Sequence, residues 1–404
     1  MGSAPMVRWT RRTRVSVKNC AVVAVAGALA VGAVSIPVAP AHAADPITAT
    51  DQAYFAYYGL DQARAKGYTG EGVTVAIIDG EVDTSAAELK GADISLRSTC
   101  TITSSSGSKT HGTTVASILV SNGYGVAPNA SLLTYRTGSK QDGDQASTDC
   151  FDGGNRLKYG YPWLINAAIN DGAQIVNLSS SSTSQDDDLK WTIARSIAQG
   201  VIVVASAGNE ASDSNAVSLS QWSGVVGVAA IGADGNRQDY SSWGQGVTTA
   251  AIGGPVAVRD YASGQVSQEY GTSFSAPVVA GVLALAKQRW PEATSNQLLQ
   301  LLVKTGLNPD HGWNQYTGFG GIDPGSILNT DPSQFPDENP LAQKQGGSSP
   351  TPEEVRQYAD GVVDPASIVN DNSYTYRGVD ESKLNDSLNV YPTHLGTSPR
   401  YHAK

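Results

Sequence analysis

The sequence has few basic residues, few cysteines and few histidines for its 404 residues. Its 27 lysines and arginines are outnumbered by 37 aspartates and glutamates, which gives a formal net charge of −10. A protein that binds nucleic acid or an anionic membrane needs a basic face, so this balance argues against both kinds of partner. The length fits one large domain with tails or two domains, and nothing in the sequence indicates an oligomeric state.

Long apolar stretches are also scarce, and the strongest one lies at the N-terminus. A basic segment precedes the apolar residues 20–34, and Ala41-His42-Ala43 follows with the small residues of a cleavage site. The alternative is a membrane anchor, but the run is short for a span and Pro37 follows it. We predict a signal peptide over residues 1–43, bacterial export to an extracellular location, and no membrane span after cleavage.

Only three cysteines are present, and Cys20 lies within the predicted signal peptide. The exported chain would keep Cys100 and Cys150. Two thiols in an oxidising compartment indicate one disulfide bond. Two buried free thiols are the alternative.

Short β-branched runs alternate with helical segments through the middle of the chain. Residues 72–79 form an apolar run that ends in Asp79, as expected of a buried parallel strand. Further strands are predicted at residues 131–135, 174–178, 201–205 and 225–229, and helices at 161–169 and 189–198. This alternation predicts an α/β fold with a doubly wound, mostly parallel sheet and helices on both faces. Ligands bind beyond the carboxyl ends of such strands, where Asp79 and Asn209 lie.

The composition changes near residue 330. Residues 331–404 are rich in Pro, Asp, Ser, Asn and Tyr, and residues 346–350 resemble a linker. We predict a short N-terminal arm over residues 44–70, one domain over residues 71–330, and a polar, low-complexity tail over residues 331–404 that is disordered or loosely packed.

Ser273 is a candidate nucleophile. It lies in the segment Gly-Thr-Ser-Phe-Ser-Ala-Pro at residues 271–277, which opens an apolar run typical of a buried helix. Pro277 is compatible with a position in or near the first turn. A serine at a helix N-terminus is close to free N–H groups, which favour a developing negative charge. A serine taken alone is weak evidence, because most serines are helix caps or surface residues.

A serine nucleophile needs a base, and a base needs an orienting carboxylate. Of the five histidines, one lies in the signal peptide and two lie in the tail. His111 opens the segment His-Gly-Thr-Thr-Val-Ala, which leads into a predicted helix at residues 115–119. The alternatives are a solvated histidine at a helix N-terminus and a capping role for Asp79.

These segments together resemble the signature blocks of the subtilisin-like serine proteases, the subtilases of peptidase family S8. The blocks are Val-Ala-Ile-Ile-Asp ending at Asp79, the His111 block, the Ser273 block, and an Ala-Gly-Asn segment ending at Asn209. The order Asp, His, Ser along the chain is that of subtilisin. The resemblance covers residues 55–330 and implies that residues 71–330 are a subtilase catalytic domain.

The resemblance implies a serine endopeptidase that hydrolyses peptide bonds through an acyl-enzyme. Asp79, His111 and Ser273 would form the catalytic triad, and Asn209 would donate to the oxyanion. The substrate would be an extended polypeptide between two pocket walls formed by Ser179, Ser180, Ser181, Ser206, Ala207 and Gly208. The three serines can equally be a solvated loop. No cofactor is required, and although calcium sites are common in the family, no aspartate-rich loop supports one here.

Two features depart from the subtilase pattern. Gly80-Glu81 follows the aspartate, where the family has a hydroxyl residue and then glycine. This leaves open a catalytically silent subtilase fold that acts as a binding or scaffold protein. Residues 44–70 are too few for a folded inhibitory prodomain. A short lead-in, a signal peptide and few cysteines resemble the mycosins of type VII secretion, which usually end in a transmembrane helix. An unrelated esterase is disfavoured because the sequence has no Gly-x-Ser-x-Gly elbow.

Overall fold

The computed structural model of the protein describes residues 46–138, 142–153, 156–180, 186–214, 218–309, 312–345 and 349–376. The predicted signal peptide therefore lies outside the described residues. The strands are β1 (Thr74–Asp79), β2 (Ile94–Arg97), β3 (Ile102–Thr103), β4 (Ser131–Arg136), β5 (Gln145–Ala146), β6 (Ile175–Leu178), β7 (Ile202–Ser206), β8 (Val225–Ile231), β9 (Val247–Ile252), β10 (Val256–Arg259) and β11 (Val266–Glu269). The helices are α1 (Ala53–Tyr57), α2 (Leu60–Ala65), α3 (Ser106–Val120), α4 (Tyr161–Asn170), α5 (Asp187–Ala198), α6 (Thr272–Arg289), α7 (Ser295–Lys304), α8 (Pro324–Asn329) and α9 (Pro352–Ala359).

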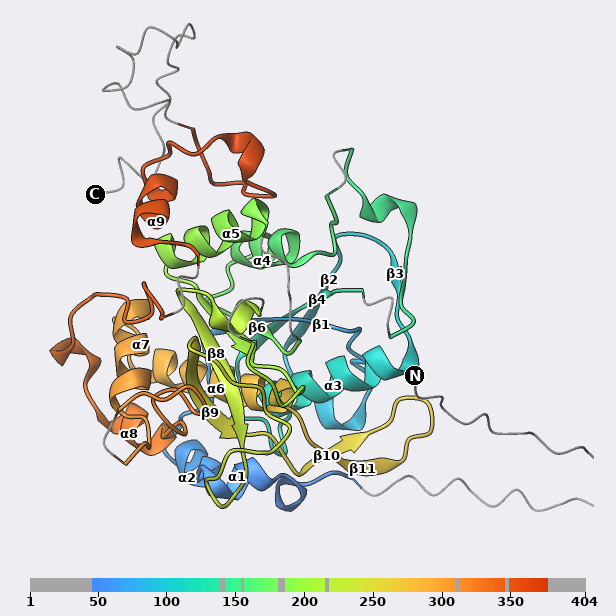
Figure 1. Cartoon of the computed structure of the whole chain (residues 1–404). Helices are drawn as coiled ribbons and strands as arrows, with labels where there is room; N and C mark the ends of the chain where they lie inside the picture. Colours follow the sequence, from blue (N-terminus) through green and yellow to red (C-terminus); the bar gives the residue numbers. More distant parts are fainter. Residues whose placement is uncertain are drawn as a thin grey trace, which may run out of the picture. The chain divides into compact units, whose positions relative to one another are not determined.

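Seven parallel strands form the central sheet, in the order β2-β4-β1-β6-β7-β8-β9 (Figure 1). Helices α3 and α6 pack on one face with the larger apolar core, and α4 and α5 pack on the other face with a second core. The prediction of a doubly wound α/β fold is confirmed. The chain builds outward from β1 in one direction through β4, and in the other through β6. The carboxyl ends of β1 and β6 therefore flank the point where a ligand site is expected.

Two helices extend beyond their predicted positions. Helix α3 begins at Ser106, because the Ser105 hydroxyl accepts a hydrogen bond from the Ser108 N–H at 3.1 Å and caps the helix. His111 consequently lies in the second turn and not at the N-terminus. Pro277 lies inside α6, also beyond the first turn. Its missing N–H removes the helical hydrogen bond to the Ser273 carbonyl.

The N-terminal arm is part of the larger core. Tyr54 and Leu60 are fully buried in it. The Gln52 side chain makes two hydrogen bonds to the main chain of Ala257, at 3.1 and 3.2 Å, in the manner of a neighbouring strand. The Tyr58 hydroxyl accepts from the Ile252 N–H at 3.0 Å. These contacts join the arm to β9 and β10.

The expectation of a disordered or loosely packed tail is wrong for the described residues 331–345 and 349–376. Helix α9 packs along α5 (Figure 1), and Tyr358 is fully buried against Trp191 and Ala194. Asp371 forms an ion pair with Arg195 at 3.2 Å, with both side chains almost completely buried. Residues 349–376 have few apolar side chains, but their polar groups form hydrogen bonds and ion pairs with the domain. Composition alone therefore misled the prediction.

Candidate active site

Asp79 and His111 form a hydrogen-bonded pair at the carboxyl end of β1. The distance from His111 Nδ1 to Asp79 Oδ1 is 2.7 Å, and the same carboxylate oxygen accepts from the Gly80 N–H at 2.7 Å. Burial lowers the pKa of His111, but the charge and hydrogen bond of Asp79, with a contribution from Asp142, leave this pKa above its ordinary value. The imidazole is therefore oriented by the carboxylate and is a stronger base than a free histidine.

The close approach of α3 to β1 explains why glycine follows Asp79. A Cβ at Gly80 would lie 2.1 Å from the Ser108 carbonyl oxygen, and one at Gly112 would lie 2.5 Å from the Gly80 carbonyl oxygen. Only glycine lets the two backbones come this close. Among the described residues, Asp79 Oδ2 is buried and has no hydrogen-bond partner.

The charge of Glu81 is compensated locally. Its two carboxylate oxygens pair with Lys109 at 3.3 Å and with Arg136 at 3.2 Å. Glu81 thus adds a group of paired charges and not an isolated anion beside Asp79.

Ser273 is the second residue of α6 and is 8% exposed. The ring of the next residue, Phe274, lies 5.9 Å from the His111 ring, measured between centroids. Within the part of the chain that the structure describes, no hydrogen bond joins the Ser273 hydroxyl to the imidazole. Catalytic hydrogen bonds are often long without substrate and tighten in the complex.

Asn209 is fixed by Thr272, a residue that the sequence motif contains but whose role we did not predict. Asn209 Oδ1 accepts from the Thr272 N–H and hydroxyl, both at 2.9 Å, and the Gly208 N–H donates to the same hydroxyl at 3.1 Å. The Asn209 NH₂ group takes no part in these hydrogen bonds. A Cβ at Gly271 would lie 3.0 Å from Ser273 Oγ and 3.4 Å from Asn209 Nδ2, so both groups border one small space.

A cavity of about 670 Å³ opens beside the Asp79–His111 pair. Of the residues predicted for the substrate pocket, Ser179 and Ser180 line this cavity, and Ser181 lies outside the described residues. Ser206, Ala207 and Gly208 do not line this cavity. Ser206 ends β7, Ala207 and Gly208 follow it, and all three are buried just before Asn209 in the chain. The sequence prediction missed the lining residues Tyr161, Asp142 and Asp144. They come from segments outside the motifs, and no local pattern marks them.

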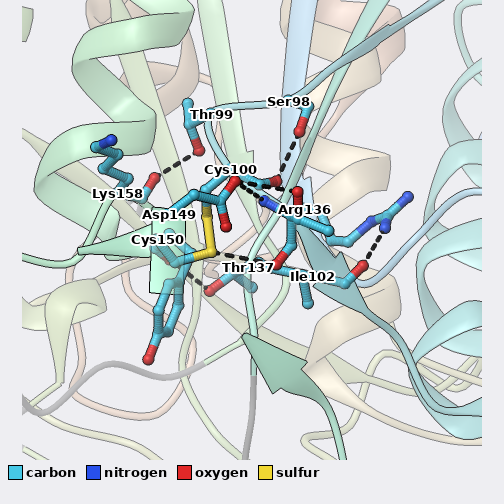
Figure 2. The surroundings of a disulfide bond; sticks show 11 residues. Ser98, Thr99, Cys100, Ile102, Arg136, Thr137, Asp149, Cys150 and Lys158 are labelled. Atoms are coloured by element: carbon cyan, nitrogen blue, oxygen red, sulfur yellow. Dashed lines mark hydrogen bonds between the residues drawn. A yellow bond between two sulfur atoms is a disulfide. The ribbon is translucent and has the colours of Figure 1, made fainter. Parts of the chain in front are cut away.

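The predicted disulfide joins Cys100 to Cys150 (Figure 2). Next to it, the Thr101 N–H donates to Asp149 at 3.0 Å, and β3 pairs with β5. The Asp144 carboxylate, just before β5, accepts from the Ser105 N–H at 2.8 Å and from the Ser108 hydroxyl at 3.0 Å. The disulfide thus holds together the segment that enters α3 and the segment that carries Asp142 and Asp144.

Across the described ranges, no group of three or more His, Cys, Asp or Glu side chains could hold a metal ion. None of the helices in those ranges is long and apolar enough to cross a membrane.

Comparison with known proteins agrees with this geometry. The model of the subtilase family matches residues 70–320, more than half of the chain. Subtilisin E of Bacillus subtilis is 28% identical over 267 residues, which cover 61% of this chain and 65% of that protein. Subtilisin of Bacillus pumilus is 29% identical over 267 residues, 61% of this chain and 90% of that protein. The chain therefore spans about two thirds of the length of several curated relatives.

Solved structures of proteases are similar to this chain as well. The prenylagaramide maturation protease PagA has a TM-score of 0.54 and 25% identity, covering 67% of this chain and 97% of that chain. MycP1 of Mycobacterium smegmatis has a TM-score of 0.58 and 24% identity, covering 76% of this chain and 89% of that chain. At 24% identity, the similarity to MycP1 shows only that the two folds are alike.

Proposed function

Because the chain belongs to the subtilase family, we propose that it is a secreted serine endopeptidase with Asp79, His111 and Ser273 as its catalytic triad. The observation that carries the proposal is the arrangement around Ser273. Asp79 orients the His111 imidazole, and the ring of Phe274, the residue after Ser273, lies 5.9 Å from the imidazole between centroids. Ser273 Oγ and Asn209 Nδ2 border one small space beside Gly271. A protein that only binds peptides has no need of both groups.

Each step of acyl transfer has a candidate residue. His111 takes the proton of Ser273 as the hydroxyl attacks the scissile carbonyl carbon, and Asp79 stabilises the imidazolium that forms. The carbonyl oxygen becomes an oxyanion, which accepts hydrogen bonds from Asn209 Nδ2 and the Ser273 N–H. His111 then gives its proton to the leaving amine, and water hydrolyses the acyl-enzyme. This sequence uses no cofactor.

The substrate is an extended polypeptide whose N-terminal part lies along the cavity beside His111. Ser179 and Ser180 form one wall, and Tyr161, whose hydroxyl is hydrogen-bonded to Ser180, narrows it. Ser181 would continue this wall toward the mouth. The opposite wall of the primary pocket would be Ser206, Ala207 and Gly208. Carboxylates of Asp142 and Asp144 on the lining favour neutral or basic substrate side chains over acidic ones.

The proposal includes export by the signal peptide at residues 1–43 and an arm that stays attached afterwards. Burial of Tyr54 and Leu60, and the pairing of Gln52 with β10, support a permanent structural arm. N-terminal sequencing of active, exported enzyme tests this. Activity that appears only after loss of residues up to about 70 would show that the arm is a propeptide.

The function is tested by incubating residues 44–404 and the Ser273→Ala variant with a mixed peptide library. Mass spectrometry should find internal cleavage products with the wild type and none above background with the variant. The alternative is a silent scaffold protein. Binding of library peptides by both proteins, without cleavage by either, would favour that alternative.

A further inference from the structure

The candidate base and the candidate nucleophile come from different helices. His111 lies in α3 and is joined directly to Asp79, whereas Ser273 lies in the first turn of α6. Within the described ranges, no hydrogen bond joins Ser273 to the imidazole. The spacing between His111 and Ser273 is therefore set by the elements that carry them and by whatever connects those elements.

The hairpin of β10 and β11 leads into the Ser273 segment. The two strands pair in antiparallel fashion, and β10 packs beside α3 (Figure 1). At the base of the hairpin, the Gly271 N–H donates to the Gly253 carbonyl at 2.8 Å. A Cβ at Gly271 would lie 3.0 Å from Ser273 Oγ. The base of the hairpin is thus fixed next to the nucleophile.

The far end of β10 reaches the residue that precedes His111. The Tyr261 N–H donates to Thr110 Oγ1 at 2.8 Å. The Thr110 hydroxyl in turn donates a weaker hydrogen bond to the Asp260 carboxylate at 3.4 Å. Asp260 and Tyr261 follow directly after β10. One hydroxyl therefore uses both its acceptor and its donor to hold the tip of the hairpin against the turn that carries His111.

Glu81, which departs from the subtilase pattern, supports the same contact. Its carboxylate pairs with Lys109 at 3.3 Å, and Lys109 Nζ lies 4.7 Å above the centre of the Tyr261 ring. Tyr261 is 45% exposed, so these contacts are weaker than they would be in the interior. They nevertheless place the segment after Asp79, the turn before His111 and the hairpin tip in one connected group.

An ion pair anchors the body of the hairpin separately. Arg259, the last residue of β10, pairs with Glu88 at 2.8 Å, and the Glu88 side chain is 5% exposed. This pair fixes the strand to the segment that follows β1. The Thr110 hydrogen bonds act closer to the reacting groups, because Thr110 is the chain neighbour of His111.

We infer that Thr110 is a positioning residue for the reaction, an inference that rests on the proposed function of His111 and Ser273. Its hydroxyl fastens the hairpin tip to α3 while the hairpin base stands beside Ser273. The hairpin is therefore a spacer that keeps the imidazole and the serine hydroxyl at the separation that proton transfer needs.

The test compares Thr110→Val and Thr110→Ser in the intact exported protein. Valine keeps the shape of the side chain but can neither accept from Tyr261 nor donate to Asp260, whereas serine can do both. On one peptide, Thr110→Val should lower kcat about 10-fold with KM nearly unchanged, and Thr110→Ser should stay close to the wild type. Circular dichroism gives the folded fraction. A merely structural role would lower the unfolding temperature and leave kcat per folded molecule unchanged.

Thr113→Val is the matched control. Thr113 lies on the same helix, and its hydroxyl accepts from the Asp83 N–H at 2.9 Å, which ties α3 to the segment after Asp79 and not to the hairpin. Its kcat should match that of the wild type. If Thr110→Val does not fold, Thr110→Ala removes the same hydroxyl and gives the same comparison.

The outcomes separate this inference from the proposed function. An active wild type with an equal kcat in folded Thr110→Val, or with an equal loss in Thr113→Val, would overturn the role of Thr110 and leave the proposed function in place. A folded wild type that cleaves no peptide would overturn the proposed function itself.

Discussion

Two pairs in this protein each join an aspartate to a basic side chain, but the pairs differ in their surroundings. In the Asp79–His111 pair, the carboxylate is 5% exposed and the imidazole is 34% exposed beside a cavity. In the Asp371–Arg195 pair, the side chains are 0% and 2% exposed and sealed between α5 and the C-terminal segment. The first pair has one partner that can meet a substrate and exchange a proton. The second has a partner that is permanently charged and enclosed, so it can contribute only to structure.

The largest effect is expected when the Asp79–His111 pair, here called the cleft pair, is broken. Asp79→Asn should lower kcat/KM by about 10⁴-fold, because the imidazole loses the carboxylate that sets its tautomer and stabilises its charged form. Peptide hydrolysis and circular dichroism measure activity and fold in parallel. A loss below about tenfold in folded enzyme would remove Asp79 from the triad.

An aspartate-to-asparagine substitution in the Asp371–Arg195 pair, here called the enclosed pair, should instead lower stability. Asp371→Asn should lower the free energy of unfolding by about 3–5 kcal/mol, because Arg195 keeps a buried charge without its counter-charge. kcat per folded molecule should not change. Asp187→Asn is the matched control: Asp187 pairs with Lys190 on the surface, and its loss should cost at most about 1 kcal/mol. Equal costs for the two variants in denaturant titrations would mean that burial does not distinguish them.

A smaller loss is expected when Asn209, the proposed oxyanion donor, is removed. Asn209→Ala should lower kcat by about 10²–10³-fold with a smaller change in KM, since the amide acts on charge that develops in the transition state. Steady-state kinetics on one peptide separates the two constants. An effect confined to KM would assign Asn209 to substrate binding instead.

The smallest effect is expected from a change in the electrostatic potential at His111. Its pKa is raised in part by Asp142, so Asp142→Asn should lower that pKa. The neutral imidazole is the active base, so kcat/KM rises with pH through the His111 pKa. The acid limb of the profile should therefore move to lower pH in the variant. A limb that stays in place or moves to higher pH would contradict the assignment.

The cleft pair was predictable from sequence and the enclosed pair was not. Asp79 ends an apolar strand, and His111 and Ser273 lie in segments whose spacing and composition are rarely found without their chemistry. Asp371 and Arg195 lie 176 positions apart with no local pattern. Their pairing depends on how a polar segment satisfies its hydrogen bonds against α5. The role of Thr272 was also missed, because its contact with Asn209 forms only when the end of β7 and the start of α6 come together in the fold.

The most direct test of the account is active-site labelling by a fluorophosphonate. This probe reacts with a serine only when a base and an oxyanion site activate it. Exported wild-type enzyme should carry one adduct, located by peptide mass spectrometry on Ser273, and Ser273→Ala and His111→Ala should remain unlabelled while folded. Folded wild-type protein without an adduct, or with an adduct on another serine, would contradict the central claim.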